Sequence, residues 1–385
     1  MSAHPVSRRA VLGAALGAFT TAAAGCQQTP DALTAGARPG EPIVLGLLTD
    51  RSRRLRGEGY RFMDGVRNGV LWATSRTRDI GDRTVVVDWV DDAGDPAQAA
   101  TAAEDLVSRG CRMLLGGSTS DAALRIADVA TRRRVVYIAG TPTADALTGL
   151  GRYVFRSGHQ DSQDLLAARA VIGPGRRTVV LATGDVTTAT GILGATAVVA
   201  PVTTTDFAPV IARIRAMRPE VLYVWWPQPA TALWRALDRA GLLTGLEVVT
   251  KLGPRATWPG YGVDVASLRL VTSYLDGASD NNAYQALRVA VPGRRTDSGH
   301  IEGFLAAQMA VRALQFGPED TDRMIGALES YRAGSVKGDL WVRASDHALL
   351  QSMYQVRMTW TGAAGALTGV KTRELLPEDT APPVR

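Results

Sequence analysis

Residues 85–139, VVVDWVDDAGDPAQAATAAEDLVSRGCRMLLGGSTSDAALRIADVATRRRVVYIA, alternate short apolar runs with longer segments of helical spacing. The apolar runs are continuously hydrophobic, which is typical of parallel strands that are buried on both faces. The pattern therefore predicts a βαβαβ unit with helices on both sides of a parallel sheet. Its expected elements are, in order, 85–90, 97–108, 113–115, 122–131 and 135–139.

The first helix of this unit has a clear start signal. Asp95 stands where a side chain would cap the helix, and Pro96 occupies the first helical position. Asp91 and Asp92 precede it, so a cation site formed by three carboxylates is the alternative. The spacing lacks the D-x-D-x-D-G pattern and the twelfth-position glutamate of a calcium loop. We therefore interpret the three aspartates as a turn at a strand end followed by a helix cap.

The same alternation continues on both sides of this unit. Before it, residues 43–48 predict a strand and 62–72 a helix. After Arg156, a second series predicts a second α/β lobe. Its expected elements are 161–170, 178–182, 195–200, 208–217, 221–225, 231–240, 246–250 and 268–274. The last quarter differs, with helices expected at 301–316 and 320–331 and strands at 340–342 and 353–360.

The amino-terminal residues have the pattern of an export signal. Arg8 and Arg9 precede an apolar run over 10–24, which resembles a twin-arginine signal, and Gly25-Cys26 resembles the end of a bacterial lipobox. Cleavage before Cys26 and acylation of its thiol would anchor the protein to a membrane. A plain signal peptide with a chance cysteine is the alternative. We expect a signal over 1–26, a flexible tether over 27–41 and a flexible tail over 371–385.

Composition says little about partners. The chain has 385 residues, 46% of them hydrophobic and 21% charged, which is ordinary for a globular protein. A formal charge of +6 would suit nucleic acid or an anionic membrane surface. However, only three of the 43 basic residues are lysines, and alanine, glycine and valine are abundant. GC-rich coding is therefore the favoured source of the basic charge, and no nucleic-acid partner is expected.

Motifs for catalysis and cofactors are missing from the sequence. It has no G-x-x-x-x-G-K-S/T phosphate loop, and residues 116–120 lack the closing glycine of a hydrolase elbow. His159, His300 and His347 are far apart and lack the spacing of metal ligands. We therefore expect no enzyme activity, no cofactor and no metal site.

Small hydroxyl residues follow two expected strands of the first lobe. Ser118, Thr119 and Ser120 follow the strand at 113–115, and Thr141 and Thr143 follow the strand at 135–139. In an open parallel sheet such loops lie along the carboxyl edge, where ligands bind. Helix N-termini there favour an anionic group such as a carboxylate. Simple helix capping is the alternative role of these residues.

Several stretches across residues 42–362 together resemble the type I periplasmic binding proteins of the leucine/isoleucine/valine-binding group. No single stretch is specific, but their order and spacing are. The matching stretches are 91–96, 115–120, 143–148, 154–156 with Asp161 and Gln163, 205–207, 303–304 and 338–340.

The resemblance implies an α/β fold of two Rossmann-like lobes with parallel sheets, joined by three hinge crossovers and closing on a small solute. Lobe one would comprise 42–155 plus 277–337, and lobe two 156–276 plus 338–370.

The resemblance also implies the ligand-binding residues. Ser120 and Thr143 match positions that hold a ligand carboxylate, and Thr141 matches a residue whose backbone contacts the ligand amine. Trp226 stands where family members present an aromatic residue of lobe two. Ser118, in the same loop as Ser120, is a further ligand-binding candidate.

The chain departs from the family pattern at three places. Arg255 follows Gly253-Pro254, where amino-acid binders place an acidic residue that pairs with the ligand ammonium. The helix expected over 184–195 is much shortened, and the loop 50–59 carries Arg51, Arg53, Arg54 and Arg56. Two interpretations follow. The arginines would suit a more anionic solute, since arginine pairs bidentately with carboxylate, or they form a solvated rim and amino-acid binding has been lost.

The expected function is therefore that of a lipid-anchored solute-binding protein of an ABC importer. It would capture an amino-acid-like or small carboxylate ligand at the outer face of the cytoplasmic membrane and deliver it to a permease with its ATPase. An envelope sensor or scaffold of the same fold is the alternative, and an exported α/β enzyme is the second alternative.

Overall fold

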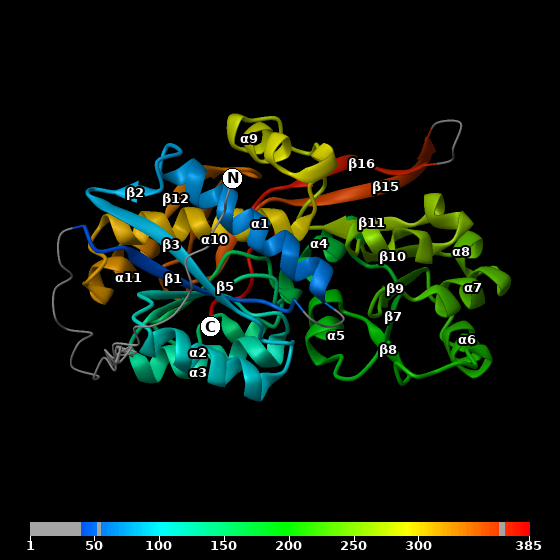
Figure 1. The fold of residues 1–385 in the computed structure, drawn as a ribbon. Helices are drawn as coiled ribbons and strands as arrows, with labels where there is room; N and C mark the ends of the chain where they lie inside the picture. Colours follow the sequence, from blue (N-terminus) through cyan, green and yellow to red (C-terminus); the bar gives the residue numbers. More distant parts are fainter. Residues whose placement is uncertain (1–39, 52–54, 362–365) are drawn as a thin grey trace, which may run out of the picture.

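The computed structural model describes residues 40–385 except 52–54 and 362–365, and the chain forms two α/β lobes that lie side by side (Figure 1). Arg8, Arg9 and Cys26 lie outside the described residues, as do Arg53 and Arg54. Within the described ranges, no helix is both long enough and apolar enough to cross a membrane.

Lobe one is built on a six-stranded sheet with the strand order β2-β3-β1-β4-β5-β6. Every neighbouring pair is parallel except β2–β3. The strands are β1 (Ile43–Leu48), β2 (Asp79–Ile80), β3 (Arg83–Val90), β4 (Met113–Gly116), β5 (Val136–Ala139) and β6 (Val154–Arg156). One face carries α2 (Pro96–Ser108) and α3 (Ser120–Arg133), and the other packs against α1 (Arg56–Ala73), α9 (Asn282–Ala290), α10 (Ser298–Gln315) and α11 (Thr321–Glu329). The predicted βαβαβ unit is confirmed.

The cap that starts α2 is also confirmed. The Asp95 side chain accepts hydrogen bonds from the backbone N–H groups of Ala97 and Gln98, both at 2.9 Å. The buried Asp92 accepts from the N–H groups of Gly94 at 3.0 Å and Ser118 at 2.8 Å. These carboxylates therefore hold loops together, and no group of metal-ligating side chains able to bind an ion occurs among the described residues.

Lobe two is built on a seven-stranded sheet with the order β16-β15-β11-β10-β9-β7-β8. Its centre is parallel, and β15 and β16 are added antiparallel at one edge. The strands are β7 (Thr178–Ala182), β8 (Thr196–Val199), β9 (Val221–Trp225), β10 (Glu247–Lys251), β11 (Arg269–Thr272), β15 (Met353–Thr361) and β16 (Ala366–Leu375). Its cores are formed with α4 (Asp161–Ile172) and α5 (Thr187–Leu193) on one face and α6 (Ala208–Ala216), α7 (Thr231–Arg239) and α8 (Leu242–Gly245) on the other.

A small third sheet belongs to lobe one. Because of it, the chain passes to lobe two for the last time at a later residue than the sequence predicted. It consists of β12 (Arg332–Ser335), β13 (Gly338–Val342) and β14 (Leu349–Gln351). Leu340, Val342 and Leu349 are buried in the core of lobe one. The prediction that lobe two resumes at residue 338 is therefore wrong, since the chain crosses only after β14. A three-residue apolar run does not reveal which of two cores it enters.

The carboxyl-terminal tail is ordered, so the prediction of a flexible tail over 371–385 is also wrong. Residues 371–375 belong to β16, which pairs with β15. Beyond the strand, Thr380 is buried, and the Pro382 carbonyl accepts a hydrogen bond from the Arg343 guanidinium at 2.8 Å. The polar, proline-rich composition of this segment suggested a flexible chain and gave no sign of its contacts with the two lobes.

Helices α1 and α10 pack closely on lobe one, and glycines permit it (Figure 1). A Cβ added at Gly65 would lie 2.2 Å from the His300 carbonyl oxygen, and one at Gly303 would lie 2.1 Å from that of Phe62. Gly69 lies against Phe304 in the same way, at 2.5 Å. The two backbones therefore touch, which only residues without a Cβ allow.

Gly303→Ala is expected to lower the free energy of unfolding by about 3 kcal/mol, because the new methyl group forces the helices apart. Gly326→Ala in α11 is the matched control. Nothing lies within 4 Å of a Cβ at Gly326, so it should gain about 0.5–1 kcal/mol from helix propensity. Urea denaturation followed by circular dichroism measures both, and equal effects in the two variants would contradict the tight contact.

Candidate functional site

Two adjoining cavities lie between the lobes, at the carboxyl ends of the strands, as expected for open α/β sheets. Their volumes are about 200 Å³ and about 390 Å³, and both are lined by Thr143 of lobe one and by Lys251, Gly253 and Pro254 of lobe two. We call the smaller one the acidic cavity; it is further lined by Glu58, Thr141, His159, Asp164, Arg255, Trp258, Asp276, Asp297 and Glu302, among others. We call the larger one the tryptophan cavity; it is further lined by Asp161, Asp185, Trp225, Trp226 and Gln228, among others.

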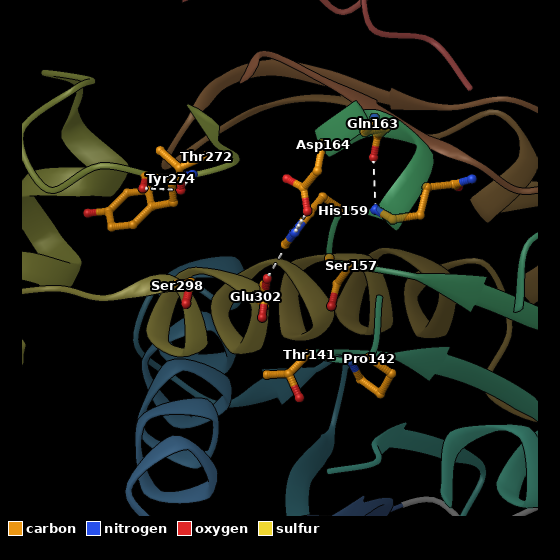
Figure 2. A network of polar contacts seen from close by, with 12 residues as sticks. Thr141, Pro142, Ser157, His159, Gln163, Asp164, Thr272, Tyr274, Ser298 and Glu302 are labelled. Atoms are coloured by element: carbon orange, nitrogen blue, oxygen red, sulfur yellow. Dashed lines mark hydrogen bonds and ion pairs between the residues drawn. The ribbon is translucent and has the colours of Figure 1, made fainter. Parts of the chain in front are cut away.

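A column of charged side chains connects the lobes at the acidic cavity (Figure 2). The His159 Nε2 lies 3.2 Å from Asp164 Oδ2, and its Nδ1 lies 3.5 Å from Glu302 Oε1. Lys251 Nζ lies 2.7 Å from the same Asp164 oxygen. Asp164 lies on α4 and Lys251 on β10, both in lobe two, whereas Glu302 lies on α10 of lobe one. His159, in the first crossover, therefore bridges carboxylates of both lobes.

The column favours a charged imidazole. Burial disfavours the charged form of His159, but the charge of Asp164 and the contacts with Asp164 and Glu302 together outweigh burial and raise the pKa of the ring. The same contact works in reverse on Asp164. Although the carboxylate is buried, His159 and Lys251 hold its pKa well below the usual range. Each member of the pair thus favours the charged form of the other.

The surroundings of Glu58, in the first turn of α1, disfavour its ionised form. Burial and the neighbouring Asp297 raise the pKa of Glu58 to about 7, and Glu302 adds to the effect. Its basic neighbour Arg61 lowers the pKa, but lies 3.8 Å away and also contacts Asp297 at 3.6 Å. The close packing of α1 on α10 thus brings like charges together.

Arg255 is already engaged by its neighbours. Its guanidinium lies 3.4 Å from Asp276 and stacks on Trp258, with 4.5 Å between the Cζ atom and the ring centroid. Its backbone N–H donates to Asp297 at 3.2 Å. These contacts balance its charge, which disfavours the interpretation of Arg255 as a binder of anionic solutes.

Ser118 and Ser120 line neither cavity. The Ser118 hydroxyl accepts a hydrogen bond from the Asp50 backbone N–H, and the Ser120 hydroxyl accepts one from Ala144 N–H at 3.3 Å. The side chain of Thr119, between them, caps α3. All three side chains thus hold loops in place, which matches the capping alternative better than direct ligand contact.

The other candidates face the cavities. Thr141 lines the acidic cavity and Thr143 lines both. Trp226 lines the tryptophan cavity, is 8% exposed, and packs edge-on against Phe207 with 5.9 Å between ring centroids.

Sequence reasoning missed the charged groups of the acidic cavity, although two signals pointed to them. Lys251 is one of only three lysines in an arginine-rich chain, and it directly follows the strand predicted over 246–250. Glu302 is one of two charged residues in the otherwise mostly apolar helix predicted over 301–316. A charged residue at a strand end or within a mostly apolar helix is a candidate functional group.

Two departures noted in the sequence have structural counterparts. Arg51 stacks on Trp89, with 3.7 Å between its guanidinium carbon and the ring centroid, so it packs against aromatic surface. Arg56 begins α1. The helix in the region 184–195 is α5, which has only 7 residues, as the sequence predicted.

Comparisons with known proteins identify the fold. The sequence model of a family described as periplasmic binding protein matches residues 42–366. The Leu/Ile/Val-binding protein BraC3 of Rhizobium johnstonii is 30% identical over 132 residues, which is 34% of this chain and 36% of that protein. The alignments with BraC3 and with a Leu/Ile/Val-binding protein homologue of Brucella melitensis cover 36% and 33% of those proteins, which is about a third of their length.

Solved structures align over nearly the whole described chain. A branched-chain amino acid ABC transporter protein from Rhodopseudomonas palustris has a TM-score of 0.79 and 27% identity, covering 89% of this chain and 99% of that one. A solute-binding protein of an ABC transporter from R. palustris, in complex with 4-hydroxybenzoate, has a TM-score of 0.76 and 18% identity, covering 87% and 97%. At 18% identity, the similarity to the 4-hydroxybenzoate-bound protein shows only a shared fold.

Glu58→Gln is expected to stabilise the protein above neutral pH. Because the pKa of Glu58 is raised to about 7 in the folded state, stability present below the unfolded value of 4.5 is lost as the pH rises to 7. The variant should gain about 1–3 kcal/mol at pH 8 and nothing at pH 4. Urea titrations at both pH values measure this, with Glu378→Gln at an exposed position as control. Equal stability of variant and wild type at pH 8 would contradict the strain.

Proposed function

Because the chain belongs to the periplasmic binding protein family, we propose that it is the substrate-binding component of an ABC importer. In this proposal it captures an amino-acid-like or small carboxylate solute between its lobes and presents the closed form to a permease with its ATPase. The activity is binding without turnover.

The observation that carries the proposal is the pair of cavities lined from both lobes. Thr141, Thr143 and Glu58 come from lobe one, and Lys251 and Trp226 from lobe two. A solute that contacts both sets stabilises the closed arrangement, and a ligand shifts an equilibrium only by such differential contact. The likeness to a branched-chain amino acid transporter protein at 27% identity supports the importer role.

The charged and aromatic lining of the two cavities favours a working site over a sensor or scaffold that has lost binding. Thr143, shared by the two cavities, supplies a hydroxyl for a carboxylate, and the ammonium of Lys251, which is paired with Asp164, lies beside it. Trp225 and Trp226 supply apolar surface beside them. We place the ligand carboxylate near Thr143 on these grounds.

A panel of amino acids and small carboxylates is expected to contain compounds that raise the melting temperature by several degrees. A ligand at a hundred times its Kd adds about 2.7 kcal/mol to the stability of the bound form. Thr143→Val should weaken the best ligand about tenfold, whereas Thr203→Val, on an exposed turn, should not. A flat response across the panel would favour the sensor or scaffold alternative.

We further propose export with the twin-arginine pair Arg8 and Arg9 and anchoring at Cys26 on the outer face of the membrane. Cys26→Ala is then expected to move the protein from the membrane fraction to the soluble extracytoplasmic fraction, because the acyl chains are its only proposed anchor. Immunoblots of fractionated cells measure this, with Cys111→Ala as control, since Cys111 is buried in lobe one. Membrane retention of the Cys26→Ala variant would rule out the lipid anchor.

A further inference from the structure

The loop that follows β5 lines both cavities, and its two ends are attached to lobe one. We call residues 141–148 the cleft loop. It begins directly after the strand, and Leu147, near its end, is buried in a core of lobe one. Its hydrogen bonds to the loop after β4 are long, at 3.4 Å for Thr141 Oγ1 with the Gly117 carbonyl and 3.3 Å for the bond that the Ser120 hydroxyl accepts. The middle of the cleft loop therefore depends on other contacts.

A buried arginine holds the middle of the cleft loop. Arg156, the last residue of β6, is 1% exposed, and burial lowers the pKa of Arg156 to about 10, so its guanidinium stays charged at neutral pH. Among the described residues it donates to neutral oxygens of the cleft loop and of the first crossover (residues 157–160). These are Pro142 O at 2.9 Å, Ala144 O at 3.3 Å, Thr148 Oγ1 at 2.9 Å, Gly158 O at 3.2 Å, His159 O at 2.7 Å and Gln160 Oε1 at 3.5 Å. Arg156 therefore ties the loop to the crossover.

A second set of hydrogen bonds ties the cleft loop to lobe two. The Thr143 carbonyl accepts a hydrogen bond at 2.8 Å from the N–H of Asp161, the first residue of α4. Asp145 Oδ1 accepts from the N–H and the hydroxyl of Ser162 at 3.1 Å and 2.7 Å, and from the Gln160 side-chain amide at 2.8 Å. The carboxylate thus lies at the N-terminus of α4, where the helix dipole favours negative charge. These bonds are shorter than those to the loop after β4.

We propose that Arg156 and Asp145 are positioning residues that make the middle of the cleft loop move with helix α4. This inference rests on the proposed function, because it describes how the same binding site responds to the angle between the lobes. When lobe two turns on the crossovers, α4 carries the loop with it, and Thr143 changes its position relative to the loop after β4. A ligand in contact with Thr143 then favours one lobe angle over others, which is the differential contact that a conformational shift requires.

A purely local role accounts for fewer of these contacts. A helix cap is normally supplied by the residue just before the helix, whereas Asp145 and Ser162 are 17 residues apart and belong to different lobes. The guanidinium of Arg156 has five N–H donors in a fixed planar arrangement. Because those donors reach carbonyl groups in both segments, they fix the cleft loop and the crossover relative to each other.

Distances between the lobes test the proposal without a ligand. Spin labels attached through Asp128→Cys on α3 and Arg235→Cys on α7 lie at exposed positions of lobe one and lobe two. The full chain carries Cys26→Ala, so that this thiol is not labelled, and Cys111 is buried. Double electron–electron resonance then gives the distribution of distances between the two lobes in the ligand-free protein.

Asp145→Ala is expected to widen this distribution, because it removes the acceptor that joins the cleft loop to α4. Asp145→Asn keeps an oxygen at that place and should stay close to wild type, which distinguishes the bond from the mere presence of a side chain. Arg156→Lys should widen the distribution too, since an ammonium cannot reach both segments. Asp121→Ala, at an exposed position in the first turn of α3, is the control. An unchanged distribution in Asp145→Ala overturns the inference.

The best compound of the thermal panel extends the test to binding. By isothermal titration calorimetry, Asp145→Ala should weaken this compound about tenfold, and Asp145→Asn should recover most of the affinity. The compound should narrow the distance distribution of the wild type and narrow that of Asp145→Ala less. Unchanged affinity and equal narrowing overturn the inference and leave the proposed function intact. A panel without any binder overturns the proposed function, and the ligand-free distances then decide the inference.

Discussion

The backbone contact between α1 and α10 is the constraint on which the site depends. Helices usually pack with their axes 8–10 Å apart because side chains separate them. Gly65 and Gly303 remove those side chains at the crossing, where added Cβ atoms would overlap the facing carbonyl oxygens. Glu58 lies near one end of this crossing and Glu302 beside Gly303. The same packing that completes the core of lobe one therefore brings two carboxylates together at the cleft.

The cleft concentrates charge at a cost to stability, as binding sites commonly do. Burial and carboxylate neighbours raise the pKa of Glu58, and Asp164 holds one oxygen without a donor. His159 meanwhile contacts both Asp164 of lobe two and Glu302 of lobe one. Where the sequence places Arg255 instead of an acidic residue, the structure offers carboxylates from the opposite lobe.

Much of the fold could be predicted from the sequence, because strand and helix patterns are local. Continuous apolar runs located β1, β4, β5 and β7 closely, and the Asp95-Pro96 cap located the start of α2. The strand β16 was missed because its exposed residues alternate with few apolar ones, and β13 was assigned to the wrong lobe because its three apolar residues fit either core.

The site was only partly predictable, because its charged groups meet through space. Thr141, Thr143 and Trp226 follow strands, so their strand-end positions indicated the cavities. Ser118 has the same local pattern but hydrogen-bonds Asp50, a contact between loops 68 residues apart that no local pattern reveals. The pairing of His159 with Glu302 spans two lobes and needed the tertiary structure.

The most direct test of the central claim is a crystal structure of the protein with the tightest-binding compound of the panel. We predict the ligand between the lobes, in contact with Thr143 of lobe one and with residues of lobe two that line the same cavities. A ligand that contacts one lobe only, or that lies outside both cavities, would contradict the account.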